Sequence, residues 1–361
     1  MRLTPPDSGR TALLAVGLSV LLVTAGCTGF IGGEGSGSGD GAATERVPAD
    51  ASMVGYVDAA GMLEDDSLRD LANAAFEAQG QSEFYSGPTS VEEWLTQVED
   101  ESGLDPSNVE SMTFYGTEGE SVPTNAQQAG AVIETSFTED EIVSAMEESG
   151  TEFAEESHQD TTVYTYGYQN QNALAALGDG AFVVGDTTAV ESVLDVDAGD
   201  EEALGGELLA QFESTDDGYL RFAADVPQDQ LPADELGGNS QVDTSAFNAV
   251  TYVSGSFDTS GDEVSMRMNM ISESSDDASR INDVVDGALS LYSGVGGDEL
   301  REALEKLSVS QDGDTVTVTY TDTVDELEDR IEAMYSMSGS ASATGSASSS
   351  TDATDGAATT A

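Results

Sequence analysis

The chain contains almost no cysteine, histidine or lysine. Its 361 residues include one cysteine and one histidine, and Lys306 is the single lysine beside nine arginines. One cysteine excludes an intrachain disulfide, so the stability of the fold has to come from packing. One histidine, His158, leaves a single candidate for a histidine-based metal site, a proton relay or a Ser-His-Asp triad.

The motifs of several catalytic families are missing as well. The sequence has no H-E-x-x-H, C-x-x-C, G-x-S-x-G or P-loop pattern, and its glycine-rich tract 32–41 does not fit G-x-G-x-x-G. His158 lies in a strand-like stretch, 151–159, among neighbouring acids, which favours an exposed histidine without a catalytic role. Carboxylates are so numerous that no pair stands out as an acid/base couple. We therefore expect no enzymatic activity and no cofactor.

The charge is strongly unbalanced. There are 70 Asp and Glu against 10 Lys and Arg, giving a formal net charge of -60 and a pI near 4.1. Such a chain repels itself at low salt, whereas at molar salt the screening length falls to about 3 Å. The composition resembles that of haloarchaeal proteins, which implies an extreme halophile and solvent cations as constant partners. Nucleic-acid binding is disfavoured, because no basic stripe exists to neutralise phosphates.

The N-terminus has the pattern of an export signal. Arg2 and Arg10 precede an apolar run, 11–26, that is too short for a membrane-spanning helix of about 20 residues. The run ends at Cys27, where the chain turns polar. These 27 residues resemble a lipoprotein signal peptide, although Thr24 stands where that family more often has an aliphatic residue. The resemblance implies cleavage before Cys27, a lipid on its thiol and an anchor at the extracellular face of the cell membrane.

Composition shifts divide the rest of the chain. The expected order is a signal peptide, a lipidated Cys27 with a Gly/Ser tether, a first α+β half, a second α+β half, and a disordered Ser/Ala/Thr tail. The corresponding ranges are 1–26, 27–45, 46–202, 203–336 and 337–361. No Asn-x-Ser/Thr sequon occurs, so N-glycosylation is not expected.

Helices and strands alternate through the two halves. A Ser or Thr followed three residues later by Glu or Asp predicts five helix starts, at Ser90, Thr138, Thr188, Ser274 and Thr323. A further helix is predicted over 62–78. Period-2 patterning predicts strands at 53–58, 109–116, 129–137, 161–168, 181–185, 219–225, 249–257, 263–271 and 316–320, with a hairpin turn at Asp312-Gly313.

The order of these elements repeats. Three strands, a capped helix, two strands and another capped helix occur in each half, which predicts two pseudo-repeated halves. Strands joined by short turns predict an α+β fold, with antiparallel sheets and helices packed on one face. In this pattern the body resembles uncharacterised extracytoplasmic α+β domains of prokaryotes.

Two groups of residues are candidate contact sites. Asp195, Asp197 and Asp200 resemble the start of an EF-hand loop, but glycine comes one place early and position twelve is Gly206. They could form a weak Ca²⁺ or Mg²⁺ site, or simply an acidic loop in solvent. The tyrosine stripe Tyr164, Tyr166 and Tyr168 could stack on a sugar or a protein partner, or pack under a helix.

These observations favour a non-catalytic cell-surface lipoprotein with a binding or structural role. One alternative is the solute-binding subunit of a transporter, a class that is often lipid-anchored but alternates strands and helices in parallel sheets. Another is a carboxylate-based hydrolase. The identity of a protein or sugar partner cannot be read from the sequence.

Overall fold

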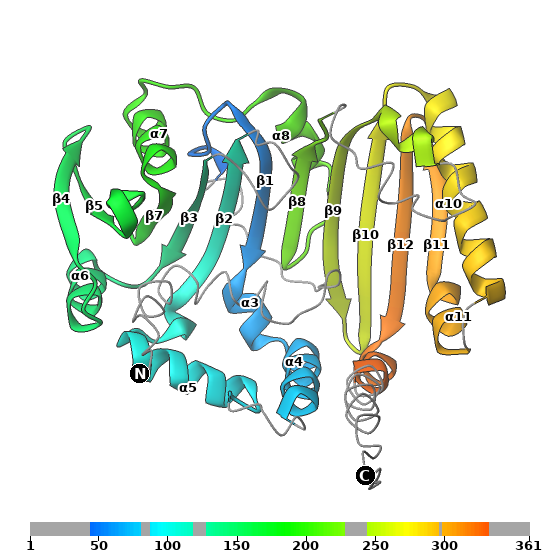
Figure 1. The fold of residues 1–361 in the computed structure, drawn as a ribbon, viewed down its shortest axis with the longest axis horizontal. Coiled ribbons are helices and arrows are strands. Elements are labelled where there is room, and N and C mark those ends of the chain that lie inside the picture. Colours follow the sequence, from blue (N-terminus) through cyan, green and yellow to red (C-terminus); the bar gives the residue numbers. More distant parts are fainter. Residues whose placement is uncertain (1–43, 81–86, 118–127, 228–243, 296–297, 332–361) are drawn as a thin grey trace, which may run out of the picture.

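A computed structural model describes residues 44–80, 87–117, 128–227, 244–295 and 298–331. Its centre is one 12-stranded sheet with the order β11-β12-β10-β9-β8-β1-β2-β3-β7-β6-β5-β4 (Figure 1). Every pairing between neighbouring strands is antiparallel. The predicted antiparallel α+β class is therefore confirmed.

Some consecutive strands are joined by short hairpin turns, and others by longer connections that contain helices. Their bounds are β1 Ala51–Asp58, β2 Val109–Thr117, β3 Ala129–Thr135, β4 Phe153–His158, β5 Thr161–Tyr166, β6 Asn172–Gly178, β7 Ala181–Asp186, β8 Leu220–Asp225, β9 Val250–Ser260, β10 Glu263–Ser272, β11 Leu307–Asp312 and β12 Thr315–Thr323. The turn predicted at Asp312-Gly313 joins β11 to β12, and Gly313 adopts a φ of 61°, a conformation that favours glycine.

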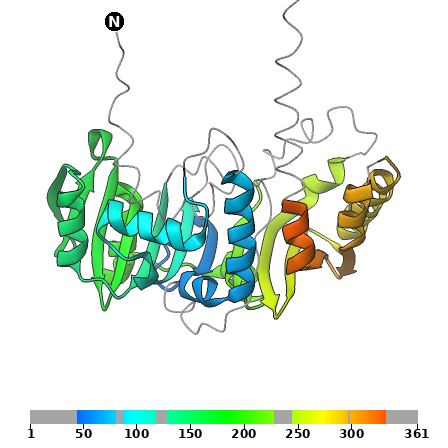
Figure 2. The ribbon, with the colours of Figure 1, turned by 90° about the horizontal axis from the view of Figure 1, so that it is seen from below.

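The helices occupy both faces and one end of the sheet. Their bounds are α3 Ala59–Glu64, α4 Asp66–Gly80, α5 Val91–Ser102, α6 Glu139–Glu148, α7 Thr187–Ala198, α8 Gly206–Glu213, α10 Ser275–Val295 and α11 Asp298–Glu305, with a last helical segment at 324–331. Helices α4 and α5 and the segment 324–331 lie along the lower end of the strands (Figures 1 and 2). Within the described ranges, no helix is both long and apolar enough to cross a membrane.

Two hydrophobic clusters lie on opposite faces of the sheet. One packs α7 and α8 against β1, β8 and the strands of the first half, and includes Tyr252. The other packs α10 against β10 and β12, and includes Val253. Consecutive residues of a strand point to opposite faces. The structure thus refines the expectation of helices on one face: each face carries helices, over different strands.

Four of the five predicted helix starts have the expected cap. Thr138 and Glu141 form a full capping box, and the Ser90 hydroxyl accepts the Glu93 N–H at 3.2 Å. Ser274 and Thr323 accept the N–H of the third following residue in the same way. Thr188 is wrong as a start, because α7 begins one residue earlier after Asp186, which makes no side-chain cap.

Two further expectations need correction. The first half contains four strands after α6, where two were predicted as the counterparts of β11 and β12. The missed strand β6 has the sequence NALAALG, and alanine and glycine give little β signal. The helix predicted over 62–78 is two helices, because Asp65 adopts an extended conformation between α3 and α4.

The predicted repeat is visible in the sheet order. Outward from the central β1·β8 pair, one half reads β1-β2-β3-β7-β6 and the other reads β8-β9-β10-β12-β11. Chain order and sheet order correspond position by position, and β4 and β5 extend the first half. Because β1 and β8 are antiparallel neighbours, a two-fold rotation about an axis normal to the sheet relates the halves. Such a rotation places corresponding residues of the two halves on the same face of the sheet.

Asp65 connects the helices at the end of the sheet to its strands. One carboxylate oxygen accepts the Leu68 N–H at 2.8 Å. The other accepts the hydroxyls of Tyr219, at 3.1 Å, and Thr259, at 2.9 Å, both of which are buried.

We predict that Asp65→Ala destabilises the fold by about 1–3 kcal/mol, the cost of leaving buried hydroxyls without a partner. Chemical denaturation at constant high salt measures the change. The control Asp70→Ala removes the same charge from an exposed position of α4 and should change stability far less. Equal effects of the two substitutions would show that Asp65 acts through its charge alone.

Candidate functional site

The acidic loop 195–202 begins in the last turn of α7, and Gly199, with a φ of 79°, caps the helix after Ala198. Its backbone turns back on itself, since the N–H groups of Asp200 and Glu201 both donate to the Asp195 carbonyl. The Asp195 carboxylate accepts a hydrogen bond from the Gln159 amide at 2.6 Å, and this hydrogen bond lowers its pKa. The same amide also donates to Asp200, at 2.8 Å.

The three aspartates do not converge on one point. Asp195 and Asp200 share Gln159, whereas Asp197 forms an ion pair with Arg46 at 3.3 Å. Across the described part of the chain, no group of three His, Cys, Asp or Glu residues is placed to hold a metal ion. The loop therefore acts in this structure as the attachment of the β4–β5 turn to α7.

His158 belongs to the same attachment. Its Nε2 lies 2.8 Å from Asp195 Oδ1, and its Nδ1 lies 3.9 Å from Glu191. Its side chain is 29% exposed, so the expectation of an exposed strand histidine holds only in part. Both ring nitrogens face carboxylates of α7, an arrangement that holds the edge hairpin against this helix.

The tyrosine stripe is shorter than its spacing suggests. Tyr164 and Tyr166 are buried on β5, and the Tyr164 hydroxyl donates to Glu139 at the start of α6 at 2.8 Å. The Phe153 ring meets Tyr164 edge-on at 5.5 Å. Burial raises the pKa of Tyr164 to about 12, assisted by its contact with Glu139. Tyr168 lies beyond the strand and is 79% exposed, so Tyr164 packs against the start of α6, Tyr166 is buried on the same strand and Tyr168 stands apart.

The remaining predicted site residue, Cys27, lies outside the described residues.

An open hollow is formed near the start of the described chain. Its walls include Glu45, Glu110, Glu134 and Asp179, together with the Arg46–Asp197 ion pair. Glu134 accepts a hydrogen bond from Ser111 at 2.9 Å. The hollow combines exposed acids with one arginine that is already paired, and this gives it the character of a hydrated surface depression.

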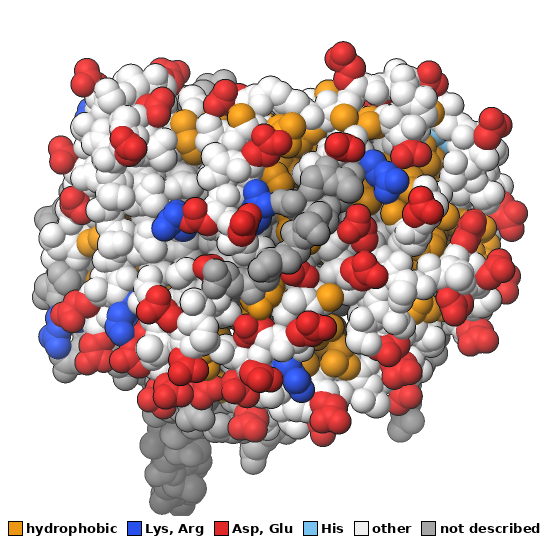
Figure 3. Space-filling model, turned by 180° about the vertical axis from the view of Figure 1, so that it is seen from behind, with side chains coloured by type: hydrophobic (Ala, Val, Ile, Leu, Met, Phe, Trp, Pro, Cys, Tyr) orange, Lys and Arg blue, Asp and Glu red, His pale blue; other side chains and the backbone are white. Residues whose placement is uncertain are grey.

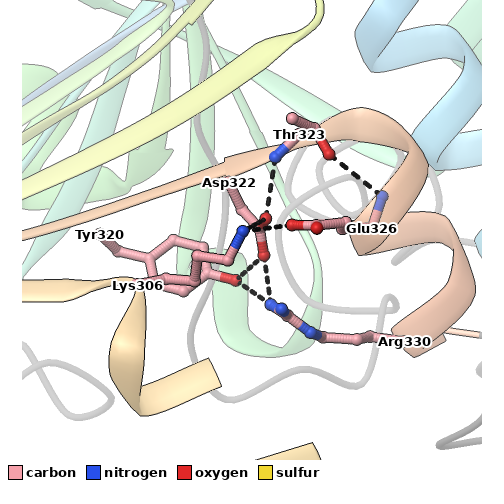
Figure 4. A network of polar contacts seen from close by, with 6 residues as sticks. All are labelled: Lys306, Tyr320, Asp322, Thr323, Glu326 and Arg330. Atoms are coloured by element: carbon pink, nitrogen blue, oxygen red, sulfur yellow. Dashed lines mark hydrogen bonds and ion pairs between the residues drawn. The ribbon is translucent and has the colours of Figure 1, made fainter. Parts of the chain in front are cut away.

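The most organised polar cluster was not foreseen from the sequence. Asp322, at the end of β12, has a fully buried side chain. It lies between Lys306 Nζ, at 2.9 Å, and the Arg330 guanidinium (Figure 4). The Tyr320 hydroxyl donates to it at 2.8 Å and the Thr323 N–H at 2.9 Å.

These contacts fix the ionisation state of the cluster. Burial opposes ionisation of Asp322, but the hydrogen bonds that it accepts outweigh burial and hold its pKa below the ordinary 3.8. Glu326 and Asp322 raise the pKa of Lys306 to about 12. Burial and the bond to Asp322 raise the pKa of Tyr320 to about 12. At neutral pH the cluster is therefore one buried carboxylate held by two cations and a neutral phenol.

The cluster joins three elements. Lys306 precedes β11, Tyr320 and Asp322 belong to β12, and Arg330 lies on the helical segment 324–331 (Figure 4). Every strong donor is used by Asp322 or Glu326, so the arrangement fits a structural clamp and leaves no group poised for proton transfer. The sequence gives no local signal for this cluster, because Lys306 and Asp322 lie 16 residues apart.

Basic side chains elsewhere are used in the same way. Within the described residues, every lysine and arginine except Arg69 forms an ion pair with a carboxylate. Arg221 also stacks over Phe212, 4.8 Å from the ring centroid. The scarce cations of the described residues are thus almost all paired, and Figure 3 shows acidic side chains scattered widely over a surface with few basic ones.

Comparisons with known proteins give only distant similarity. No protein-family model and no curated protein matches the sequence. Crystal form III of a protein named TP0453 matches with a TM-score of 0.45 and 10% identity, over 81% of this chain and 98% of that chain. Crystal form I matches with a TM-score of 0.44 and 9% identity, over 81% and 97%. This similarity is too distant to bear on function.

We predict that Asp322→Ala destabilises the fold by about 3–5 kcal/mol, because it leaves two cations without their buried partner. The effect should depend on pH with a defined sign. The pKa of Asp322 is lower in the folded state than in the unfolded state, so its contribution is present above about pH 4 and disappears as the pH falls further. Denaturation at high salt between neutral pH and pH 3 measures it.

Glu305→Ala is the matched control, because it removes one carboxylate from the exposed Arg301–Glu305 pair, and such pairs contribute little. A variant of Asp322 as stable as the Glu305 variant at neutral pH would contradict the clamp.

Proposed function

We propose that the chain is an exported, lipid-anchored protein of a high-salt environment, with a binding or structural role at the cell surface and no catalytic one. The observation that carries the proposal is the position of Cys27, the single cysteine, directly after the short apolar run 11–26. A lone cysteine cannot stabilise the fold through a disulfide, whereas the end of a signal sequence is where a lipidated cysteine belongs.

The arrangement of titratable groups supports a non-catalytic role. His158 is held by carboxylates of α7, and the buried Asp322 is held by Lys306 and Arg330. Both clusters connect secondary-structure elements, and the acidic hollow around Glu134 is not lined by His158, Asp322, Lys306 or Arg330. A carboxylate-based hydrolase would require a paired acid and base facing a cleft. The antiparallel order of the sheet also disfavours a solute-binding subunit built from parallel strands.

The charge supports the high-salt part of the proposal. Nearly every cation of the described chain is already paired, so the excess of carboxylates has no internal compensation. Folding brings these charges closer together than they are in the expanded chain, and repulsion then opposes the compact state.

The anchor is tested by Cys27→Ser in the native host. We expect the protein to leave the membrane fraction for the medium, or to accumulate as an uncut precursor, because the lipid is absent. Fractionation followed by mass analysis of the N-terminus distinguishes these forms. Ser36→Ala, a substitution in the tether sequence, is the control and should stay membrane-bound. A Cys27→Ser protein that remains membrane-bound with a processed N-terminus would refute the anchor.

Folding should require salt. We predict cooperative folding at about 2–4 M KCl and partial or complete unfolding below about 0.5 M. At the lower concentration the screening length is no longer short relative to the distance between neighbouring carboxylates, so they repel one another. Circular dichroism across a salt titration measures this. Sucrose at low salt is the control, because it strengthens burial without screening charge and should rescue the fold less effectively than KCl. An unchanged spectrum and melting temperature down to about 0.1 M would rule out the halophilic interpretation.

A further inference from the structure

The strand β4 forms one outer edge of the sheet (Figure 1). Among the described strands it pairs with β5 alone, and its residues 154–157 are exposed. An edge strand with so little burial opens more readily than the strands inside a sheet. Side-chain contacts hold its two ends: the Phe153 ring meets Tyr164 at the start of the strand, and His158 contacts α7 at its end.

The turn between β4 and β5 is held by side chains that reach beyond it. Gln159 and Asp160 form this turn with φ angles of 49° and 62°, a left-handed conformation that glycine adopts at less cost. The Gln159 amide donates to Asp195 at 2.6 Å and to Asp200 at 2.8 Å. The end of β4 is therefore attached to α7 and the loop after it through His158 and Gln159.

The His158 ring faces a carboxylate at each of its nitrogens. Nε2 lies 2.8 Å from Asp195 Oδ1, and Nδ1 lies 3.9 Å from Glu191 Oε1. A neutral imidazole has one N–H donor and one acceptor, so in either tautomer it turns a lone pair toward a carboxylate. The imidazolium has two N–H donors and a positive charge, and this form matches both carboxylates.

The carboxylate that lies closest to the ring is ionised at neutral pH. Hydrogen bonds from Gln159 and His158 lower the pKa of Asp195 below its ordinary value. Both Asp195 and Glu191 belong to α7, so their charges act on the ring from the helix to which the hairpin is attached.

The surroundings of the ring add no competing cation among the residues described. Glu156 lies on the same face of β4, two residues away, and is exposed. Thr161, which is opposite His158 on β5, carries no charge. Arg46, at the other side of the end of α7, is paired with Asp197. The groups that face the ring thus all favour a positive charge on it.

We propose that protonation of His158 fastens β4 to α7, so that this edge of the sheet is held more firmly at about pH 5 than at about pH 8. Histidine is the side chain whose charge ordinarily changes in this range. Two facing carboxylates favour the imidazolium in the attached hairpin, and protonation and attachment therefore favour each other. When β4 detaches, the edge of β5 is uncovered, and its free N–H and C=O groups can pair with another strand. The inference does not depend on the lipid anchor.

Hydrogen exchange of the purified full-length protein in about 3 M KCl tests the proposal. We expect peptides that cover β4 to open about threefold or more less often at about pH 5.5 than at about pH 8, after correction for the intrinsic exchange rate. His158→Gln keeps an N–H donor but takes up no proton, so β4 of this variant should not gain this protection. Comparing the two proteins at each pH separates the effect of the imidazole from that of the many other acids.

Glu191→Gln removes the carboxylate that faces Nδ1 and should reduce the pH effect. Glu156→Gln is the matched control, because it removes an exposed carboxylate two residues along β4 and should leave the effect in place. Circular dichroism confirms the fold of each variant, and Glu191→Gln provides the test if His158→Gln does not fold. Equal pH effects in the native protein and His158→Gln, or weaker protection of β4 at the lower pH, would overturn the proposal. Equal effects of Glu191→Gln and Glu156→Gln would overturn the role of the contact with α7.

Discussion

The antiparallel pairing of β1 with β8 joins two repeats into one sheet. Its register runs from Met53 opposite Ala224 to Val57 opposite Leu220. On one face this junction presents Val54, Tyr56 and Ala223 to the cluster around α7 and α8. On the other face lie Gly55 of β1 and Gly255 of the adjacent β9. Because neither has a Cβ, the ring of Phe114 packs on Gly55 and the ring of Phe222 packs on Gly255. Without this pair, each half would expose an apolar edge strand, which is prone to aggregation.

Charge is the second constraint on the structure. With 10 basic residues against 70 acidic ones, the protein has few cations to place, and two of them serve the fully buried Asp322. Lys306 and Arg330 hold Asp322, and Arg46 holds Asp197. Most of the other carboxylates in the described residues are partly or fully exposed to solvent, where dissolved cations can screen them. Internal order and the salt dependence that we propose would therefore have the same origin, since a cation used as a clamp is not available to neutralise the surface.

The two halves of the fold differ in which face of the sheet their last helix covers. In the first half α7 follows β7 and covers Val183 and Val132, whereas the segment after β12 passes to the opposite face. On the corresponding face of the second half, strands β10, β12 and β11 carry Arg267, Asn269, Thr317, Thr319, Ser308 and Ser310.

The sequence by itself determined the local features. Side-chain caps at Ser90, Thr138, Ser274 and Thr323, the hairpin at Asp312-Gly313 and most strands follow from interactions within a few residues. The antiparallel class and the repeat follow from the order of these elements. Strand β6 escaped prediction because its alanines form a strand only between β5 and β7.

Tertiary structure alone decided which residues meet. Asp65 separates two helices where one was predicted: it caps Leu68 locally, and its other carboxylate oxygen is bound by Tyr219 and Thr259, which lie more than 150 residues away. Lys306 and Asp322 meet because β11 and β12 pair, and Asp195 meets His158 because α7 lies beside the β4–β5 turn. Which face of the sheet α7 and the segment 324–331 cover was likewise decided by packing, because an amphipathic stripe shows that a helix is buried but not against which surface.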